Sequence, residues 1–325
     1  MEQGNINNMS SSLTHEPRIL PDALSLPADL RAFANVKLIA FDLDGTLISH
    51  HAEAPGDRLV DLFLAFRQSK VLLTLATGRT LKGVSVALGQ LKNLAQAPLV
   101  LYNGSVVMKP EDQTLIAHIA ISRHFVESFL DQLRGSSDVS AFLYCVDPEA
   151  NFIGGGASTE VVYFAGSGFD KAKEFNGMTP RPITDFRLES AEVVAILVES
   201  RTGQAREQLL KYLQQANNVS ITSSGTKYIE IRPAGSSKAV GMQWLCDRYQ
   251  INPMNVLAVG DNDNDVELLS WAGISVSVGG ASDAARRASK YYSQHGAGKA
   301  AIEILEIVKH AQRLFKGGRK NGGKS

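Results

Sequence analysis

Blocks of apolar and polar residues alternate along the first third of the chain and predict strands and helices in turn. Continuous apolar runs at residues 36–40, 71–76 and 98–102 are typical of buried strands. Between them, residues 55–69 and 81–94 carry apolar side chains at helical spacing. Strands that lack a polar face and alternate with amphipathic helices indicate a parallel, doubly wound α/β sheet with helices on both faces.

This pattern changes after residue 104. Half-buried strands such as 193–198 and helices such as 206–215 then alternate irregularly, which predicts an α+β domain with an antiparallel sheet over residues 105–226. The expected core domain is therefore discontinuous and comprises residues 35–104 and 227–312. Its second half is predicted to contain helices at 238–249 and 266–271 and strands at 256–259 and 274–278.

The two ends of the chain do not show this alternation. Residues 1–34 are rich in Asn and Ser, contain three prolines and have no apolar signal-peptide core, so we expect a flexible arm. Residues 313–325 are rich in Gly and Lys and are expected to form a disordered basic tail.

Composition narrows the class of protein. The chain has 325 residues, 44% of them hydrophobic, which is enough for two domains with substantial cores. Its 33 acidic and 33 basic residues balance, so no overall field favours nucleic acid or an anionic membrane. Cys145 and Cys246 lie far apart in sequence and belong to no Cys/His cluster, which argues against a zinc site or a disulfide framework. We expect a cytoplasmic protein without membrane spans.

Two carboxylates stand two residues apart just after the first predicted strand. Asp42 and Asp44 belong to the run Phe41-Asp42-Leu43-Asp44-Gly45-Thr46-Leu47. Like charges this close raise each other's pKa, so a cation or a shared proton is expected to relieve them. Gly45 suits a sharp turn, and the Thr46 hydroxyl is suited to hydrogen-bond that turn.

Three more polar stretches fall at or beside strand ends, where ligands bind in open parallel sheets. Thr77 and Gly78 follow the second strand, and Lys238 begins a predicted helix. The segment 260–265, Gly-Asp-Asn-Asp-Asn-Asp, offers carboxylates and amides that suit Mg²⁺.

Each stretch by itself also has an ordinary structural explanation. The Asp pair and Thr77-Gly78 are compatible with simple turns, segment 260–265 with an acidic helix cap, and Lys238 with an exposed helix start. Their joint occurrence, each at the expected structural position, favours a shared site.

Together these residues resemble the haloacid dehalogenase-like hydrolase superfamily. The resemblance is carried by Asp42 to Thr46, Thr77 to Arg79, Lys238, Gly260-Asp261 and Asn264-Asp265, and it spans residues 36–104 and 228–292. The interval from Asp44 to Thr77 is too short for a domain, whereas the interval from Thr77 to Lys238 is long. The chain is therefore similar to the Cof-type branch, whose α+β cap domain is inserted at this second position.

The resemblance implies a nucleophile, a general acid and a magnesium site. Asp42 would attack phosphorus and form an aspartyl-phosphate. Asp44 would protonate the leaving oxygen and then activate water. Mg²⁺ would be held by the carboxylates of Asp42 and Asp261 and the main-chain carbonyl of Asp44.

The resemblance also implies how the phosphate is held. Thr77, the backbone N–H of Gly78, and Lys238 would neutralise the transferring oxygens, and Asn264 would contact the phosphate. Asp265 would orient Lys238 or a water on the metal from a position behind them.

The expected function is a Mg²⁺-dependent phosphatase of small phosphorylated metabolites, sugar phosphates first. A phosphotransferase or phosphomutase of the same superfamily is an alternative with the same chemistry. A non-catalytic regulatory protein that retains the fold is a second alternative, against which the intact carboxylates and lysine argue. The expected partner is a small metabolite, neither nucleic acid nor a membrane, and the expected state is a monomer or homodimer.

Overall fold

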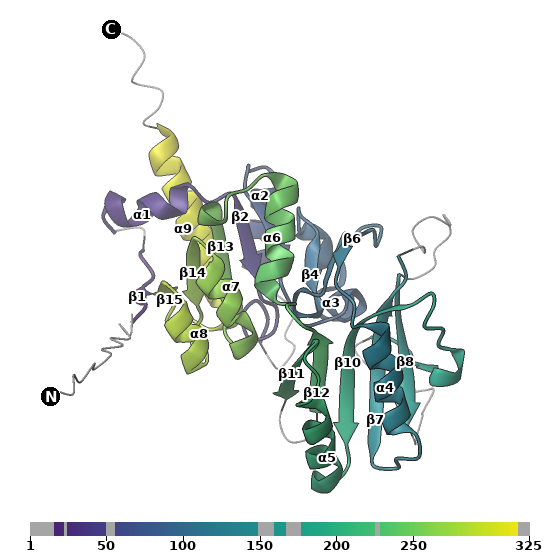
Figure 1. The fold of residues 1–325 in the computed structure, drawn as a ribbon. Helices are drawn as coiled ribbons and strands as arrows, with labels where there is room; N and C mark the ends of the chain where they lie inside the picture. Colours follow the sequence, from purple (N-terminus) through teal and green to yellow (C-terminus); the bar gives the residue numbers. More distant parts are fainter. Residues whose placement is uncertain are drawn as a thin grey trace, which may run out of the picture.

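A computed structural model describes most of the chain (Figure 1). The described residues are 16–22, 25–49, 56–148, 159–166, 177–224 and 228–317. Among these residues, no helix combines the length and the apolar character needed to cross a bilayer.

The core domain is built on a six-stranded sheet in which every neighbouring pair is parallel. An isolated parallel bridge between Ala76 and Val100 ties one further strand, β4 (Leu99–Leu101), to the edge of this sheet. The order of the six strands is β1 (Arg18–Ile19), β15 (Tyr291–Tyr292), β14 (Ile274–Ser277), β13 (Val256–Gly260), β2 (Leu38–Phe41) and β3 (Leu72–Leu75).

Helices cover both faces of this sheet, which is why central strands such as β2 and β13 are apolar along their length. Ile39 and Phe41 of β2 pack in one cluster with α1, α2 and α9, whereas Leu38 and Ala40 pack in another with α6, α7 and α8. The bounds of these helices are α1 (Pro27–Ala34), α2 (Asp57–Arg67), α6 (Lys238–Tyr249), α7 (Val266–Trp271), α8 (Asp283–Ala288) and α9 (Ala297–Gly317). The fold is therefore the predicted doubly wound α/β core.

A small antiparallel sheet extends the core. Strand β4 pairs with β5 (Val106–Met108), which pairs with β6 (Leu115–His118). The β5 side chains lie in the two core clusters. Helix α3 (Leu81–Leu88) ends earlier than the predicted helix over 81–94, and a 3-10 helix continues to Leu94. The 3-10 helices are Gly89–Leu94, Tyr102–Gly104, Ile183–Asp185, Pro253–Asn255 and Asp263–Asp265.

The second domain, the cap, contains a six-stranded sheet whose pairs are antiparallel except for β8 and β9. Helices α4 (Arg123–Leu133) and α5 (Gly203–Leu213) cover one face through residues such as Phe129 and Leu213 (Figure 1). The strand order is β11 (Val219–Ser224), β12 (Tyr228–Pro233), β10 (Glu192–Ser200), β7 (Val139–Val146), β8 (Glu160–Gly166) and β9 (Arg181–Pro182).

The other face of the cap sheet packs on the core. Phe142, Tyr144 and Phe164 belong to the same hydrophobic cluster as core residues, and the rings of Tyr144 and Tyr102 lie 5.9 Å apart. This apolar contact fixes one side of the cap against the core.

Strand pairing divides the chain differently from the sequence expectation. Strands β5 and β6, expected in the domain over 105–226, belong to the core sheet system, and β12, expected in the core, lies inside the cap sheet. The reason is that a strand belongs to the sheet whose backbone groups it satisfies, whatever its hydropathy. We propose a cap that comprises residues 120–234.

The expected arm and tail are partly folded. In the arm, β1 pairs with β15, and α1 packs on α9 with Leu30 and Phe33 buried. The expectation of a flexible segment over 1–34 therefore fails for its described residues, 16–22 and 25–34, because these two apolar side chains have a core to enter. Helix α9 extends to Gly317, beyond the expected start of the tail at 313. Residues 1–15, 23, 24 and 318–325 lie outside the described residues.

Candidate active site

The predicted polar residues meet at the carboxyl edge of the core sheet. Asp42 follows β2, Thr77 follows the neighbouring β3, and Asp261 follows β13 on the other side of β2. The backbone N–H of Asp42 still donates to the carbonyl of Val259 at 2.9 Å, so the nucleophile candidate is held by the sheet itself. Parallel strands place their carboxyl ends at one edge, which is why residues distant in sequence converge here.

Lys238 joins two of the carboxylates. Its Nζ donates to Oδ1 of Asp42 at 2.6 Å and to Oδ1 of Asp265 at 2.7 Å, and the lysine side chain is fully buried. The Ser237 side chain caps the N-terminus of α6. This capping fixes the backbone position of Lys238, from which its side chain extends into the site.

Gly104 allows this helix start to approach. It has φ +97°, and a Cβ there would lie 1.8 Å from the carbonyl oxygen of Ser237. Any side chain at this position would push the start of α6 away from the core.

Burial and charge act in opposite directions on these groups. Burial raises the pKa of Asp42 well above its usual range, Lys238 counteracts this, and Asp265 and Asp261 add to it. Burial works to lower the pKa of Lys238, but Asp265 and Asp42 outweigh burial and raise it. We infer a charged lysine that compensates a crowded set of acids.

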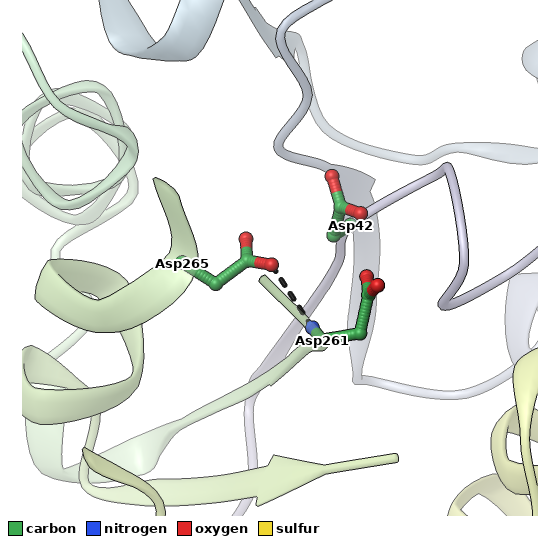
Figure 2. Close-up of side chains that lie close together, drawn as sticks. All are labelled: Asp42, Asp261 and Asp265. Carbon is green, nitrogen blue, oxygen red and sulfur yellow. Dashed lines mark hydrogen bonds between the residues drawn. The ribbon is translucent and has the colours of Figure 1, made fainter. Parts of the chain in front are cut away.

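Asp42, Asp261 and Asp265 form a compact acidic group, with one ligand atom of each within 4.8 Å of the others. Figure 2 shows the Asp42 and Asp261 carboxyl groups close together, with Asp265 to one side and its carboxylate bonded to the backbone N–H of Asp261. Thr46 donates through its hydroxyl to Oδ1 of Asp261 at 2.8 Å. The turn at Gly45, with φ +81°, brings Thr46 to this position.

The acidic group fits a small divalent cation. Asp265 is already committed, because one oxygen accepts from Lys238 and the other accepts from the backbone N–H groups of Asp261 and Asn262 at 3.0 and 3.1 Å. Asp42 and Asp261 therefore remain as the carboxylates that could hold Mg²⁺, a cation that prefers oxygen ligands.

Asp44 lies apart from this group and pairs with Arg79. The guanidinium donates to both carboxylate oxygens, from Nε at 2.7 Å and from Nη2 at 2.6 Å. The Asp44 side chain remains 35% exposed, unlike buried Asp42. This bidentate pair fixes the orientation of the Asp44 carboxylate.

The turn after β3 is held by its own backbone and by Asn103. Thr77 is buried, its N–H donates to Val100, and its carbonyl accepts from the N–H of Asn103 at 3.0 Å. A Cβ on Gly78 would lie 3.0 Å from Nδ2 of Asn103, so the amide lies directly against this turn.

Asn264 contacts Asn103 as well. Its Nδ2 donates to Oδ1 of Asn103 at 2.9 Å, and Nδ2 of Asn103 in turn lies 3.1 Å from Oε1 of Glu230 on the cap strand β12. The structure thus brings together every site residue expected from the sequence at one edge of the core, with Asp44 in a separate ion pair beside it.

Sequence reasoning assigned no role to Arg79, Asn103 or Glu230. Arg79 and Asn103 lie within the stretches that carry the family resemblance, so their position was a usable signal. Glu230 lies in the stretch 229–233, which resembles the family's usual passage out of the cap, but nothing in that stretch indicated a contact with Asn103. Thr46 was expected to bond its own turn, and it bonds Asp261 instead.

Comparisons with known proteins agree with this geometry. A family model described as haloacid dehalogenase-like hydrolase matches residues 39–303. A 5-amino-6-(5-phospho-D-ribitylamino)uracil phosphatase of Bacillus subtilis, YitU, is 26% identical over 256 residues, which cover 77% of this chain and 89% of that protein.

Solved structures share the fold. A haloacid dehalogenase-like hydrolase from Bacteroides thetaiotaomicron superposes with a TM-score of 0.67 at 21% identity and covers 84% of this chain and 98% of its own. The subclass IIB sugar phosphatase BT4131 superposes with a TM-score of 0.63 at 18% identity, with 85% and 98% covered.

The chain therefore belongs to the haloacid dehalogenase-like hydrolases, in the Cof-type branch with its cap inserted between the second and third motifs. This membership, together with relatives that are named phosphatases, makes it an enzyme of the phosphatase type.

Proposed function

We propose that this protein is a Mg²⁺-dependent phosphatase that hydrolyses small phosphorylated metabolites through an aspartyl-phosphate on Asp42. The observation that carries the proposal is the placement of the Asp42 carboxylate between a buried lysine and a second carboxylate at the edge of the sheet. Nucleophilic attack on an anionic phosphate ester needs positive charge beside the attacking oxygen, and this site provides a lysine and a cation-binding carboxylate pair.

Mg²⁺ would be held by the carboxylates of Asp42 and Asp261 and by the main-chain carbonyl of Asp44. When bound, it supplies charge that offsets the repulsion between the carboxylate and the phosphate. Thr46 would keep the Asp261 carboxylate oriented through its hydroxyl.

Asp42 would attack phosphorus with one carboxylate oxygen while the bond to the leaving oxygen breaks. The leaving oxygen would take its proton from Asp44, which then accepts a proton from the water that attacks the aspartyl-phosphate. Asp44 must be protonated for the first step, so its pairing with Arg79 has to open before the leaving group can be protonated.

The remaining residues would hold the phosphate. The Thr77 hydroxyl, the backbone N–H of Gly78 and the Lys238 ammonium would donate to the transferring oxygens, and Asn264 would contact a further oxygen. Asp265 would keep Lys238 charged and in place, as its contact at 2.7 Å supports.

Sugar and polyol phosphates are the first substrates to test. The Bacillus subtilis relative is named for a phosphorylated ribitylamino substrate, and BT4131 is described as a sugar phosphatase. We also propose that the enzyme works in the cytoplasm, as a monomer or homodimer, on free metabolites. Its balanced charge and its two buried free cysteines, Cys145 and Cys246, support this setting.

The test is phosphate release by the purified chain from a panel of sugar, polyol and nucleotide phosphates with Mg²⁺. Turnover that disappears with a chelator and returns with Mg²⁺ supports the proposal. Transfer of the phosphoryl group to a second sugar in place of water would identify a phosphotransferase. Absence of both activities across the panel would overturn the proposal.

A further inference from the structure

A continuous chain of hydrogen bonds connects the cap to the phosphate-binding turn of the core. Asn264 donates to Oδ1 of Asn103 at 2.9 Å, and Nδ2 of Asn103 lies 3.1 and 3.3 Å from the two carboxylate oxygens of Glu230. Thr222 of β11 donates its hydroxyl to Oε2 of Glu230 at 3.1 Å. Asn103 and Asn264 come from two segments of the core, whereas Glu230 and Thr222 come from paired cap strands.

Asn103 is held firmly at the centre of this chain. It is 5% exposed, its backbone adopts the left-handed conformation at φ 53° and ψ 33°, and its N–H donates to the carbonyl of Thr77. Its side chain touches Gly78 closely enough that an added Cβ would meet it at 3.0 Å. The amide of Asn103 therefore lies on the same turn that would bind the transferring phosphoryl group.

The carboxylate of Glu230 determines which group donates and which accepts in each hydrogen bond between Glu230, Asn103 and Asn264. An ionised carboxylate only accepts, so Asn103 must turn its NH₂ group toward Glu230 and its oxygen toward Asn264. Asn264 must then present its own NH₂ group to that oxygen. One of the two hydrogens is used there, and the other stays available to a ligand oxygen.

The other cap carboxylate at the core boundary serves a different purpose. Glu160 of β8 is 5% exposed and accepts from the backbone N–H groups of Leu81 and Lys82 and from the Tyr102 hydroxyl. The backbone contacts cap α3, and none of the three bonds goes to the side chains of Asn103 or Asn264. Glu160 is therefore a control for cap–core contact that is separate from the site.

We propose that Glu230 is a positioning residue that acts through Asn103 to turn the Asn264 amide into a phosphate donor. Phosphate affinity then depends on the cap strand β12 lying against the core, although Glu230 itself touches no phosphate. This inference rests on the proposed function, because it concerns the phosphate site of the same reaction.

The test measures binding of inorganic phosphate by titration calorimetry with Mg²⁺, together with kcat and KM for p-nitrophenyl phosphate and for the best sugar phosphate. Glu230→Gln introduces an NH₂ group where only an acceptor stood. We expect phosphate binding to weaken about tenfold, about 1.4 kcal/mol, because the hydrogen bond from the Asn264 amide to a charged phosphate oxygen is lost. We expect KM to rise equally for both substrates and kcat to change less than about threefold.

A double variant that exchanges the acid and the amide between positions 103 and 230 tests whether Glu230 orients the Asn264 amide or only supports the structure. In the double variant Asn103→Asp with Glu230→Gln, the new carboxylate accepts from Gln at 230 and from Asn264, so the Asn264 amide keeps its direction. We expect phosphate affinity within about threefold of the wild type, whereas Asn103→Asp alone, with two facing carboxylates, loses it. Glu160→Gln, the matched control at the cap–core boundary, should leave phosphate affinity unchanged.

Distinct outcomes overturn the inference. An unchanged phosphate affinity in Glu230→Gln, a rise in KM for the sugar phosphate alone, or a double variant no better than the single ones would each contradict it. The first two results would instead assign Glu230 to packing or to the leaving group. Phosphate binding without turnover in the wild type would refute only the proposed function, whereas absence of phosphate binding would refute both.

Discussion

The core sheet and the cap sheet use buried residues in different ways. In the core, helices cover both faces, so strands such as β2 are apolar along their whole length and polar residues stand out where the strands end. In the cap, helices cover one face, and the other face meets the core partly through rings such as Phe142 and Tyr144 and partly through polar residues such as Glu230.

This difference suggests separate roles for the two regions: the edge of the core sheet for the proposed reaction, and the cap for the position of the two domains around it. On the proposed function, polar core residues at the sheet edge would supply the groups that react, while cap residues would determine how tightly the two domains hold the site between them. Changes to the sheet-edge carboxylates should therefore alter turnover more than stability, and changes to buried cap residues should do the reverse. The following variants, from the largest expected effect to the smallest, test that separation.

Replacing Asp42 by Asn should abolish turnover. The amide keeps the shape of the side chain and can still accept from Lys238, but it cannot form the phosphoryl bond, so kcat should fall by about 10⁴-fold or more. The midpoint of thermal unfolding should not fall, because burial disfavours the charge that is removed. Hydrolysis of p-nitrophenyl phosphate at near wild-type rates would exclude Asp42 as the nucleophile.

Replacing Asp44 by Asn should slow the reaction by about 10²–10⁴-fold, the range typical of general acid–base catalysis. The loss should be smaller for p-nitrophenyl phosphate than for a sugar phosphate, because a nitrophenolate leaves without needing a proton. Steady-state kinetics with both substrates measures this difference. Equal losses for the two would contradict the assignment of Asp44 as the acid.

Replacing Phe129 by Ala should destabilise the protein by about 3–5 kcal/mol, since this ring is fully buried between α4 and the cap sheet. Urea denaturation monitored by circular dichroism measures the loss. At temperatures where the variant remains folded, kcat for p-nitrophenyl phosphate should stay within about threefold of the wild type. A loss of kcat that matched Asp44→Asn would mean that the cap takes part in the chemistry.

Replacing Glu160 by Gln should lower the free energy of unfolding by about 1–3 kcal/mol, because the new NH₂ group faces the N–H of Lys82. Burial raises the pKa of Glu160 above its model-compound value of 4.5, so the folded state holds this proton more tightly than the unfolded chain does. The contribution of this residue to the free energy of unfolding is therefore fully present below pH 4.5 and is lost as the pH rises from there through the raised folded-state pKa.

The stability of the Glu160→Gln variant does not decline in this way, because glutamine does not ionise. The difference in the free energy of unfolding between variant and wild type should therefore be largest at low pH and should shrink toward pH 8. Urea denaturation of both proteins at several pH values measures the trend. A deficit that grew with pH would show that the ionised form is the stabilising one at this contact.

Sequence was sufficient to bring the proposed site residues to one place, because Asp42, Thr77 and Asp261 follow strand ends and Lys238 begins a helix beside them. Asp42, Thr77, Lys238 and Asp261 stood out as polar residues beside apolar runs, and the structure brings them together. The doubly wound core followed from the same runs.

Sequence was insufficient where a contact depends on tertiary pairing. Whether β12 belongs to core or cap is decided by its hydrogen bonds to β10 and β11, which hydropathy does not encode. Arg79 and Glu230 contact partners far away in the chain, Asp44 and Asn103, and the stretches in which they lie do not reveal those partners. Helix α1 looked like part of an arm because its burial becomes visible only when α9 is in place.

Gly104 shows how a residue without functional groups can govern reactivity. A Cβ there would lie only 1.8 Å from the carbonyl oxygen of Ser237, so even one methyl group would displace the first turn of α6, and with it the Lys238 ammonium that would neutralise the proposed nucleophile. Gly104→Ala should therefore abolish turnover, because it would lengthen the distance between the Lys238 ammonium and the Asp42 carboxylate. Added Mg²⁺ should not restore the activity.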